Sequence, residues 1–244
     1  MTNFEKDVFR QSLIFHIPHS SVHIPFTNGF DLDLIQNEIN LLTDFDTDLI
    51  FNVPNTKQII TPFSRIFCDV ERLPDEQEVM YQFGRGFYYT HTDNGDILRY
   101  FDKDVKETIW DEFYARHHRH LNQMIEQCLD EVGFATIIDC HSFSNIPFKT
   151  DLNQNLNRPD ICIGTNSSTP SWLLNMVESF FRLNSYTIGI NFPYSGTIVP
   201  KSYENLSTVN SIMIEINRDL YMENGVSVKS LVQKLNSEII EIFS

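Results

Sequence analysis

The sequence predicts one α/β domain of three layers, in which helices flank a mixed, mostly parallel, twisted β-sheet. Six short apolar runs have the length and the β-branched content of strands, and longer segments with helical periodicity lie between them. Strands that alternate with helices form a largely parallel sheet with both faces covered. The 244 residues contain no internal repeat and no linker rich in Pro, Gly or Ser, so we expect residues 1–244 to form a single domain.

The predicted strands are bounded by polar residues, Pro or Gly. In sheets of this kind the ligand crevice lies beyond the carboxyl ends of the strands, so functional side chains are expected where the runs end. The polar stretch 149–159 is predicted to be a long loop, and loops of this length are often functional. The six predicted strands are 12–18, 58–61, 135–140, 160–163, 187–190 and 211–216.

Three helices are expected between and after the strands. Residues 104–132 place apolar side chains on one stripe, and Gly133 follows as a stop signal. Thr169 is the predicted N-cap of the next helix and Pro170 its first residue. The last helix carries its apolar stripe at Val228, Leu231, Leu235, Ile239 and Ile242.

The composition excludes several classes of protein. Eighteen Lys and Arg against 33 Asp and Glu give a net charge of −15, which would repel nucleic acid. No apolar run approaches the roughly 18 residues of a membrane span, and the first ten residues lack the pattern of a signal peptide, so a cytoplasmic protein is expected. The oligomeric state stays open. Scattered cysteines predict reduced core thiols, at Cys68, Cys128, Cys140 and Cys162.

Three strand ends carry candidate catalytic residues. His19 follows the first strand, His141 follows the middle strand, and Glu215 lies within the last. Imidazoles and a carboxylate that leave one position open are the usual ligands of catalytic zinc. The alternative interpretation is that the two histidines cap strand ends with their ring nitrogens.

Two further segments are open to two interpretations each. The acidic run 43–48 could supply a metal ligand at Asp44, or it could be a solvated helix start. Arg65 and Arg72 flank Asp69 in SRIFCDVER. Two arginines near a cleft would bind an anionic small substrate, whereas the alternative is an internal ion pair with Asp69.

The remaining histidines are weaker candidates. His16 and His19 are three residues apart on a strand and should face opposite sides, so they are not expected to bind one ion. His117 lies on an apolar helix stripe and is predicted to be a core residue, while His118 could reach a cleft. The chain has no HExxH, GxGxxG, GxxxxGK[ST] or GxSxG motif, which argues against zincins, nucleotide binders and serine hydrolases.

Taken together, nine motifs in register resemble the N-formylglutamate amidohydrolase family, from about residue 16 to residue 222. The resemblance implies a zinc carboxypeptidase-like (phosphorylase/hydrolase-like) fold with an eight-stranded sheet. It also implies hydrolysis of the N-formyl amide of glutamate to formate and the amino acid, in histidine degradation. The motifs are IPHSSVHIP, TDFDTD, SRIFCDVER, THTDNGDIL, FYARHHRHL, IIDCHSF, DICIGT, NFPYSG and IEINRDLYM.

The resemblance implies roles for individual residues. His19 and His141 match the imidazole zinc ligands, and Asp44 matches the acidic position expected to complete the set, with Asp48 as the competing choice. Glu215 matches the general base. The residues implied to bind or line the substrate are Arg65, Arg72, His118, Asn191, Tyr194 and Arg218, and those expected to orient the ligands are Asp139 and Ser142.

Three positions depart from the family pattern, Asp46 in the acidic run and two others. Glu71 replaces an asparagine of the usual DLNR segment, and Thr197 stands where a second glycine is expected. Both changes bear on the substrate, and neither falls on the expected ligands. The sequence therefore predicts a zinc-dependent amidohydrolase acting on a small anionic N-acyl amino acid, with N-formyl-L-glutamate as the first choice. The alternatives are a deacylase or carboxypeptidase-like hydrolase for another acidic acyl-amino acid, and a metal-retaining binding protein without turnover.

Overall fold

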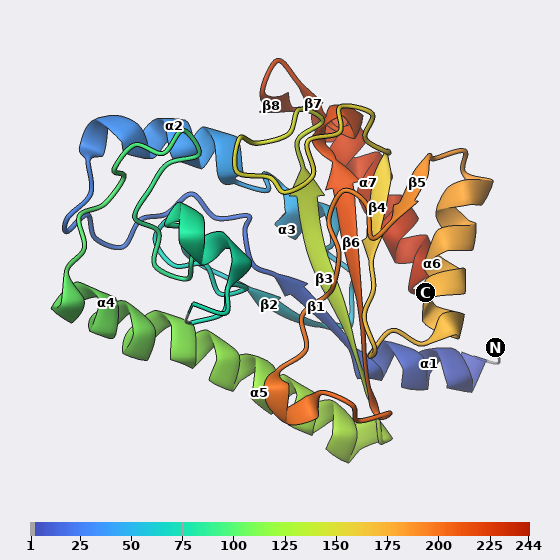
Figure 1. Cartoon of the computed structure of the whole chain (residues 1–244). Coiled ribbons are helices and arrows are strands. Elements are labelled where there is room, and N and C mark those ends of the chain that lie inside the picture. Colours follow the sequence, from blue (N-terminus) through green and yellow to red (C-terminus); the bar gives the residue numbers. More distant parts are fainter. Residues whose placement is uncertain (1–2, 75) are drawn as a thin grey trace.

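A six-stranded sheet forms the centre of the computed structural model, which describes residues 3–74 and 76–244 (Figure 1). The strand order is β2-β1-β3-β6-β4-β5. The two short strands β7 and β8 pair only with each other, as a separate antiparallel ribbon. The strands are β1 (Leu13–Ile17), β2 (Lys57–Ile60), β3 (Ala135–Phe143), β4 (Ile161–Gly164), β5 (Ile188–Ile190), β6 (Val209–Asn217), β7 (Met222–Glu223) and β8 (Val226–Ser227).

The sheet is mixed and mostly parallel, as predicted. Parallel pairing joins β2 to β1, β1 to β3, β3 to β6 and β4 to β5, and the one antiparallel pair is β4 with β6. All six predicted runs are strands, displaced by no more than three residues at either end. The eight-stranded sheet implied by the resemblance is wrong for the described residues, because β7 and β8 do not join the other six.

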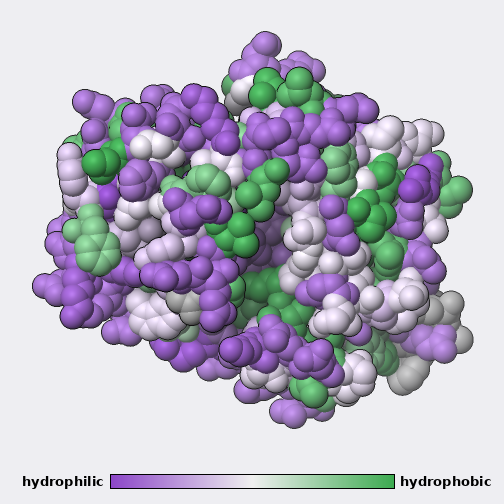
Figure 2. Space-filling view, viewed as in Figure 1, coloured by the Kyte–Doolittle hydropathy of each residue, from purple (hydrophilic) through white to green (hydrophobic). Residues whose placement is uncertain are grey.

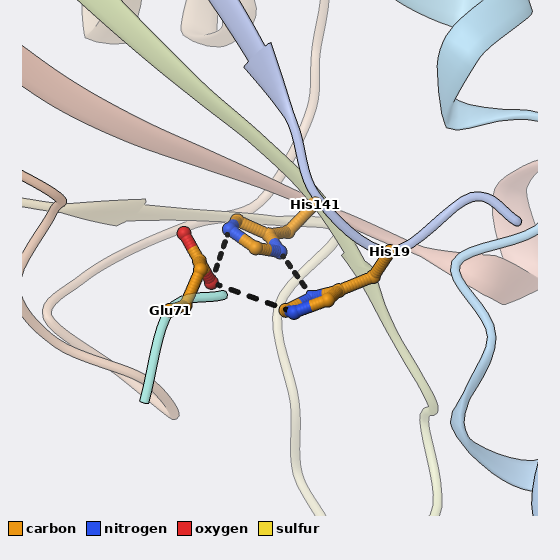
Figure 3. Close-up of side chains that lie close together, drawn as sticks. All are labelled: His19, Glu71 and His141. Atoms are coloured by element: carbon orange, nitrogen blue, oxygen red, sulfur yellow. Dashed lines mark hydrogen bonds and ion pairs between the residues drawn. The ribbon is translucent and has the colours of Figure 1, made fainter. Parts of the chain in front are cut away.

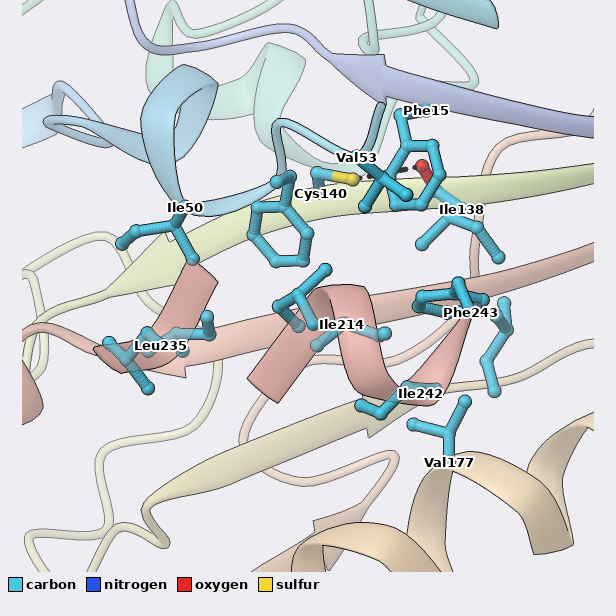
Figure 4. Close-up of a cluster of buried hydrophobic side chains, with 14 of the residues drawn as sticks. Phe15, Ile50, Val53, Ile138, Cys140, Val177, Ile214, Leu235, Ile242 and Phe243 are labelled. Atoms are coloured by element: carbon cyan, nitrogen blue, oxygen red, sulfur yellow. Dashed lines mark hydrogen bonds between the residues drawn. The ribbon is translucent and has the colours of Figure 1, made fainter. Parts of the chain in front are cut away.

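One face of the sheet is covered by α3 (Thr47–Ile50), α6 (Ser171–Leu183) and α7 (Lys229–Ile242), and α1 (Asn3–Ser12) adds Phe9 to the same core. Figure 4 shows the side chains of this core, in which Phe15, Ile138 and Ile214 project from three adjacent strands toward α7. Burial of these aliphatic and aromatic side chains is the main source of stability of this layer.

The other face packs against α5 (Ala115–Val132), the long helix at the bottom of Figure 1. The helix predicted over 104–132 exists, but a π-helical turn (Trp110–Tyr114) separates α4 (Lys103–Ile109) from α5. Gly133 ends α5 with a left-handed φ of 85°, as the stop signal predicted. The contact of α5 with the sheet involves the early parts of the strands, at Ile14, Ala135 and Ile137.

A third cluster of buried side chains lies beyond the sheet. It contains residues of α2 (Leu32–Leu42) and of the segment 61–74 and 76–102, which has only a short 3-10 helix (Val79–Phe83) and isolated bridges. Arg99 lies at its centre and is almost fully buried. The Arg99 guanidinium lies 3.6 Å from the ring centre of Tyr88 and 4.5 Å from that of Phe30, and it donates hydrogen bonds to backbone carbonyls.

Several smaller predictions can be compared with the structure. The predicted cap of α6 is wrong by one residue, because Pro170 is the N-cap and the Thr169 hydroxyl instead donates to the Ser211 carbonyl at 2.7 Å. The stretch 149–159 has neither helix nor strand, as expected. All four cysteines are buried and free. Within the described residues, no helix is long and apolar enough to cross a membrane.

Candidate active site

The alternation of side chains along three strands gathers the candidate residues on one face of the sheet. His16 pairs in register with Asp139, and His141 pairs with Glu215. Residues two apart on a strand share a face, so these side chains lie on the same side of the sheet as α5. On that side, α5 covers only the beginnings of the strands. A cavity of about 660 Å³ occupies the uncovered part, and Figure 2 shows a hollow near the centre of this side of the molecule.

His19 and His141 meet at the floor of this cavity, and Asp44 joins them from the segment before α3. Nδ1 of His19 lies 3.3 Å from Nδ1 of His141. Oδ2 of Asp44 lies 3.2 Å from Nδ1 of His141 and 3.6 Å from Nδ1 of His19. Figure 3 shows the two imidazole rings facing each other. The expected residues therefore converge at the carboxyl ends of β1 and β3.

The outer nitrogen of each imidazole lies beside a carboxylate. Nε2 of His19 is 2.9 Å from Oδ1 of Asp69, and Nε2 of His141 is 3.2 Å from Oδ1 of Asp139. This is the arrangement that fixes ring orientation in metal-binding histidines, and it leaves both Nδ1 atoms facing inward. Asp139 therefore lies beside the outer nitrogen of His141. Burial opposes ionisation of Asp69, yet Arg65 and His19 hold its pKa well below the usual value.

Glu71 reaches the same histidines from the segment after Asp69. Its Oε2 lies 3.0 Å from Nε2 of His141 and 3.9 Å from Nε2 of His19, so these three residues form a possible metal-binding group (Figure 3). Its Oε1 lies 3.5 Å from Nδ1 of His16. Glu71, His16 and Asp139 form a second such group.

His16 is a buried neighbour of the site. Its Nδ1 lies 2.9 Å from Asp139, and its Nε2 lies 2.9 Å from Nε2 of His117 on α5. Burial alone would lower the pKa of His16, but Asp139 and Glu71 raise it to about 9. His117 is buried, as predicted for a core residue. His16 and His19 belong to different groups of possible ligands, so the expectation that they do not bind one ion stays a prediction, although the rings of both lie near Glu71.

Arg218 positions Asp44. Its Nη2 donates to Oδ1 of Asp44 at 2.9 Å, its Nη1 to the Leu41 carbonyl at 2.7 Å, and its Nε to Oγ of Ser142 at 3.3 Å. Burial would raise the pKa of Asp44, but His141, His19 and Arg218 hold it below the usual value. Arg218 is not among the residues that line the cavity, whereas Ser142 is.

Glu215 lines the cavity beside His141. Its side chain is largely buried, and its Oε2 has no hydrogen-bond partner among the described residues. Burial raises the pKa of Glu215 to about 8, and the carboxylates of Asp44 and Glu71 act in the same direction, against the opposing effect of His141. A buried carboxylate with a free oxygen and a raised pKa is suited to accept a proton.

The two arginines of SRIFCDVER differ in their contacts. Arg65 donates through Nε and Nη2 to Oδ2 of Asp69, at 3.1 and 2.8 Å, and thus forms an internal ion pair with that residue. Arg72 is held more loosely, 3.6 Å from Asp69 and 3.5 Å from Glu78, and its buried Nε has no hydrogen-bond partner in the described part of the chain. Both line the cavity. Arg72 is therefore the freer of the two to bind an anion.

Of the other predicted residues, Tyr194 lines the cavity and three do not. The His118 ring packs at a tilt against Tyr114, with ring centres 4.4 Å apart. Asn191 instead fixes its own loop through hydrogen bonds with Thr165. Asp48 lies in the first turn of α3, and none of the ion pairs of the site involves it.

Two residues near the metal-binding groups were not among the predicted ligands. In the sequence, Glu71 stands out only as a departure from a family motif, and strand alternation argues against His16 as a partner of His19. The signal that could have found Glu71 is its position two residues after Asp69, in a segment already expected to border the cleft.

Comparisons with known proteins identify a family and agree with the fold. The family model for N-formylglutamate amidohydrolase matches residues 11–222. The crystal structure of N-formylglutamate amidohydrolase from Ralstonia eutropha JMP134 is 22% identical, with a TM-score of 0.82 over 96% of this chain and 93% of that chain. A crystallised gene product of Agrobacterium tumefaciens is 16% identical, with a TM-score of 0.72 over 98% of this chain and 91% of that chain. No curated protein sequence matches the chain.

Proposed function

From the premise that the chain belongs to the N-formylglutamate amidohydrolase family, we propose that it is a zinc-dependent hydrolase of N-formyl-L-glutamate. The products would be formate and L-glutamate. The metal would be held by His19, Asp44 and His141, and Glu215 would serve as the base. The family supports a hydrolase acting on an amide bond, and we infer the metal, its ligands and the substrate from the geometry and charge of the cavity.

The observation that carries the proposal is the triangle formed by three ligand atoms. At zinc–ligand distances of ~2.0–2.2 Å, the ligand atoms of a tetrahedral site lie roughly 3.3–3.6 Å apart. Nδ1 of His19, Nδ1 of His141 and Oδ2 of Asp44 are separated by 3.2, 3.3 and 3.6 Å. Three ligands of this kind leave a fourth position for water or substrate, as in catalytic zinc sites.

The charge of the surroundings also favours a divalent cation. Five carboxylates, four of them buried and Glu71 half-buried, surround the two imidazoles, and the arginines in contact with them offset only part of their charge when all five are ionised. Burying an excess of negative charge is costly without a compensating cation. The carboxylates are Asp44, Asp69, Glu71, Asp139 and Glu215, and the arginines are Arg65, Arg72 and Arg218.

Asp44 is preferred to Glu71 as the third ligand. In the group that contains Glu71, the nearest atom of His19 is Nε2, at 3.9 Å, and this nitrogen already lies 2.9 Å from Asp69. In the group that contains Asp44, both histidines use Nδ1. Within the described residues, no other carboxylate lies closer to either Nδ1 atom than Asp44 does. Glu71 would then orient His141 from its other side.

When bound, zinc lowers the pKa of a water molecule and polarises the amide carbonyl. Glu215, whose Oε2 is free of hydrogen bonds within the described residues, would take the proton of the attacking water and would then donate it to the departing amine. Because burial raises the pKa of Glu215, its carboxylate is a stronger base, which favours the first of these two transfers. Other cations remain candidates, because such ligands also accept iron and manganese.

The arginines at the cavity wall would orient the substrate. Of the two arginines of SRIFCDVER, Arg72 is the one with an unused donor, and its planar guanidinium can hold a carboxylate through two hydrogen bonds. Arg65 keeps Asp69 in place and so supports His19 indirectly. Tyr194 also lines the cavity. An N-acyl amino acid with a free carboxylate fits this distribution of charge.

The proposal can be tested by measuring zinc content and formate release from N-formyl-L-glutamate with the purified protein. We expect about one zinc per chain, loss of activity on chelation and recovery with zinc. Asp44→Asn should lose zinc, while Glu71→Gln should retain it. Turnover of only a longer acyl-glutamate would show the alternative deacylase, and zinc binding without turnover of any acyl-amino acid would show a binding protein.

A further inference from the structure

A second cavity, of about 740 Å³, lies between the edge strand β2 and the first half of α5. It shares no lining residue with the catalytic cavity. Figure 1 shows β2 at one edge of the sheet, on the side where α5 runs. We call this second cavity the edge groove. Its lining residues are Ile59, Ile60, Pro62, Phe63, Glu112, Phe113, Arg116, His117, Arg119, His120 and Gln123.

One wall of the edge groove is basic. Arg116, Arg119, His120 and Gln123 are spaced three, four and seven residues along α5, so they project from one face of the helix. All four are exposed. The wall is therefore a row of hydrogen-bond donors and cations beside a concave surface.

These two arginines are unlike the others in the chain. Of the ten arginines in the sequence, seven form ion pairs, and Arg99 is held by carbonyls and rings. Arg116 and Arg119 are the two for which the described part of the chain offers neither a carboxylate nor a carbonyl partner. Even Glu112, one turn before Arg116, is not within ion-pairing distance. In a protein with a net charge of −15, this is a local concentration of uncompensated positive charge.

The floor of the edge groove is apolar. Ile59 and Phe63 are buried beneath it, and the side chain of Ile60 is 43% exposed at its rim. The volume lies within the range of small-molecule sites, which combine an apolar lining with a few polar groups. An exposed arginine pair beside an apolar floor can bind an anionic head and an apolar body at the same time.

We propose that the edge groove is a second ligand site, which binds a small organic anion through Arg116 and Arg119. The anionic group, a carboxylate, sulfonate or phosphate, would lie against the two guanidinium groups, and an apolar ring or chain would lie on Ile59, Ile60 and Phe63. The proposal does not depend on the reaction at the catalytic cavity.

The test uses two probes that differ in charge. The anionic dye 8-anilinonaphthalene-1-sulfonate carries a sulfonate on an aromatic body, and N-phenyl-1-naphthylamine has the same rings without the sulfonate. Fluorescence titration of the wild type should show one dye per chain, with the neutral compound at least tenfold weaker. Arg116→Gln with Arg119→Gln should weaken dye binding at least tenfold, and unchanged thermal unfolding would show that the double variant is folded.

Matched controls distinguish binding in the edge groove from attraction to surface charge and from binding in the catalytic cavity. Lys201→Gln with Lys229→Gln removes the same charge from exposed positions outside the groove and should leave dye binding unchanged. Arg72→Leu should also leave it unchanged, because that residue lines the other cavity. The proposal is overturned if the wild type fails to bind the dye one-to-one, if the Arg116 and Arg119 changes have no effect, if the lysine control weakens binding equally, or if Arg72→Leu abolishes binding.

Discussion

The sheet and the irregular segment of residues 61–74 and 76–102 contribute different parts of the candidate active site. Three of the central groups, His19, His141 and Glu215, lie on or directly after strands of the sheet. The segment supplies Arg65 and Arg72, with Asp69 behind His19. The sheet therefore carries the two histidines that would bind metal and the group that would move protons, and the segment carries those that orient them and hold the substrate.

The two regions are also stabilised in different ways. The sheet is held by two large clusters of aliphatic and aromatic side chains packed against helices. The segment has little regular structure and is organised around the buried Arg99 and its carbonyl and ring contacts. The difference indicates that changes in the sheet should alter the chemical step, and changes in the segment should alter substrate binding or local stability.

The largest effect is expected on kcat, from a change in the sheet. Glu215→Gln keeps the size of the side chain but cannot accept a proton, so kcat should fall by on the order of 10²–10⁴ while zinc content stays normal. The measurement is formate release together with zinc analysis. Glu38→Gln is the matched control, because it removes another buried carboxylate, one that accepts hydrogen bonds from the Asp93 backbone amide. Near-normal kcat in Glu215→Gln would exclude this residue as the base.

The next largest effect is expected on substrate binding, from a change in the segment. Arg72→Leu should raise KM by up to about a hundredfold and leave zinc content unchanged, because a bidentate charged contact contributes up to ~3 kcal/mol. Arg72→Lys should rescue only part of the loss, since it lacks the planar fork. A kcat defect with an unchanged KM would contradict the division of roles between the two regions. Arg182→Leu on α6, with its own ion pair at the surface, serves as the control.

The stability of the segment can be compared with that of the sheet. Arg99→Met leaves the Tyr89 and Phe67 carbonyls without their donors and should lower the free energy of unfolding by about 2–4 kcal/mol. Ile214→Val in the sheet core should cost only about 0.5–1.5 kcal/mol. Urea denaturation of both variants checks the order. An Arg99→Met variant as stable as Ile214→Val would mean that Arg99 does not organise the segment.

A smaller effect, which depends on pH, is expected on the free energy of unfolding from a residue where the segment meets the loop 149–159. Asp93 accepts hydrogen bonds from Arg85 and from the backbone amides of Lys149 and Thr150. Burial opposes ionisation of Asp93, but these contacts, with the Thr150 hydroxyl, lower its pKa below the usual 3.8. A lowered pKa in the folded state stabilises the protein above the unfolded pKa, and this stabilisation is lost as the pH falls through the folded value.

Asp93→Asn should therefore lower the free energy of unfolding by about 1–3 kcal/mol at pH 7. The difference from the wild type should begin to shrink as the pH falls below about 4. Urea denaturation at pH 7, 5 and 3 is the measurement. A difference that stays constant down to pH 3 would show that the charge of Asp93 contributes nothing.

The sheet was predictable from sequence to a greater extent than the segment. Runs such as ATIIDC combine β-branched residues with strand length, so local composition was enough to place β3 and its five partners. The segment is set by contacts between residues distant in sequence. Arg99 packs on Phe30, for example, and no periodic pattern in the sequence predicts that contact.

The same distinction applies to the site. His19, His141 and Glu215 were predicted from strand ends, and the structure brings His19 and His141 within 3.3 Å of each other. The place of Glu71 beside His16 and His141 was not predicted, because it depends on how the turn after Asp69 folds back over the sheet. The resemblance implies a substrate-binding role for Arg218, but its orientation toward Asp44 follows from tertiary packing, which the sequence does not show.

The central claim is that His19, Asp44 and His141 hold the catalytic metal. The most direct test is an anomalous difference map recorded at the zinc absorption edge from crystals of the zinc-loaded protein. We expect one peak at ~2.0–2.2 Å from Nδ1 of His19, Nδ1 of His141 and an oxygen of Asp44. A peak held by Glu71 and the Nε2 atoms, or no peak between the two histidines, would contradict the claim.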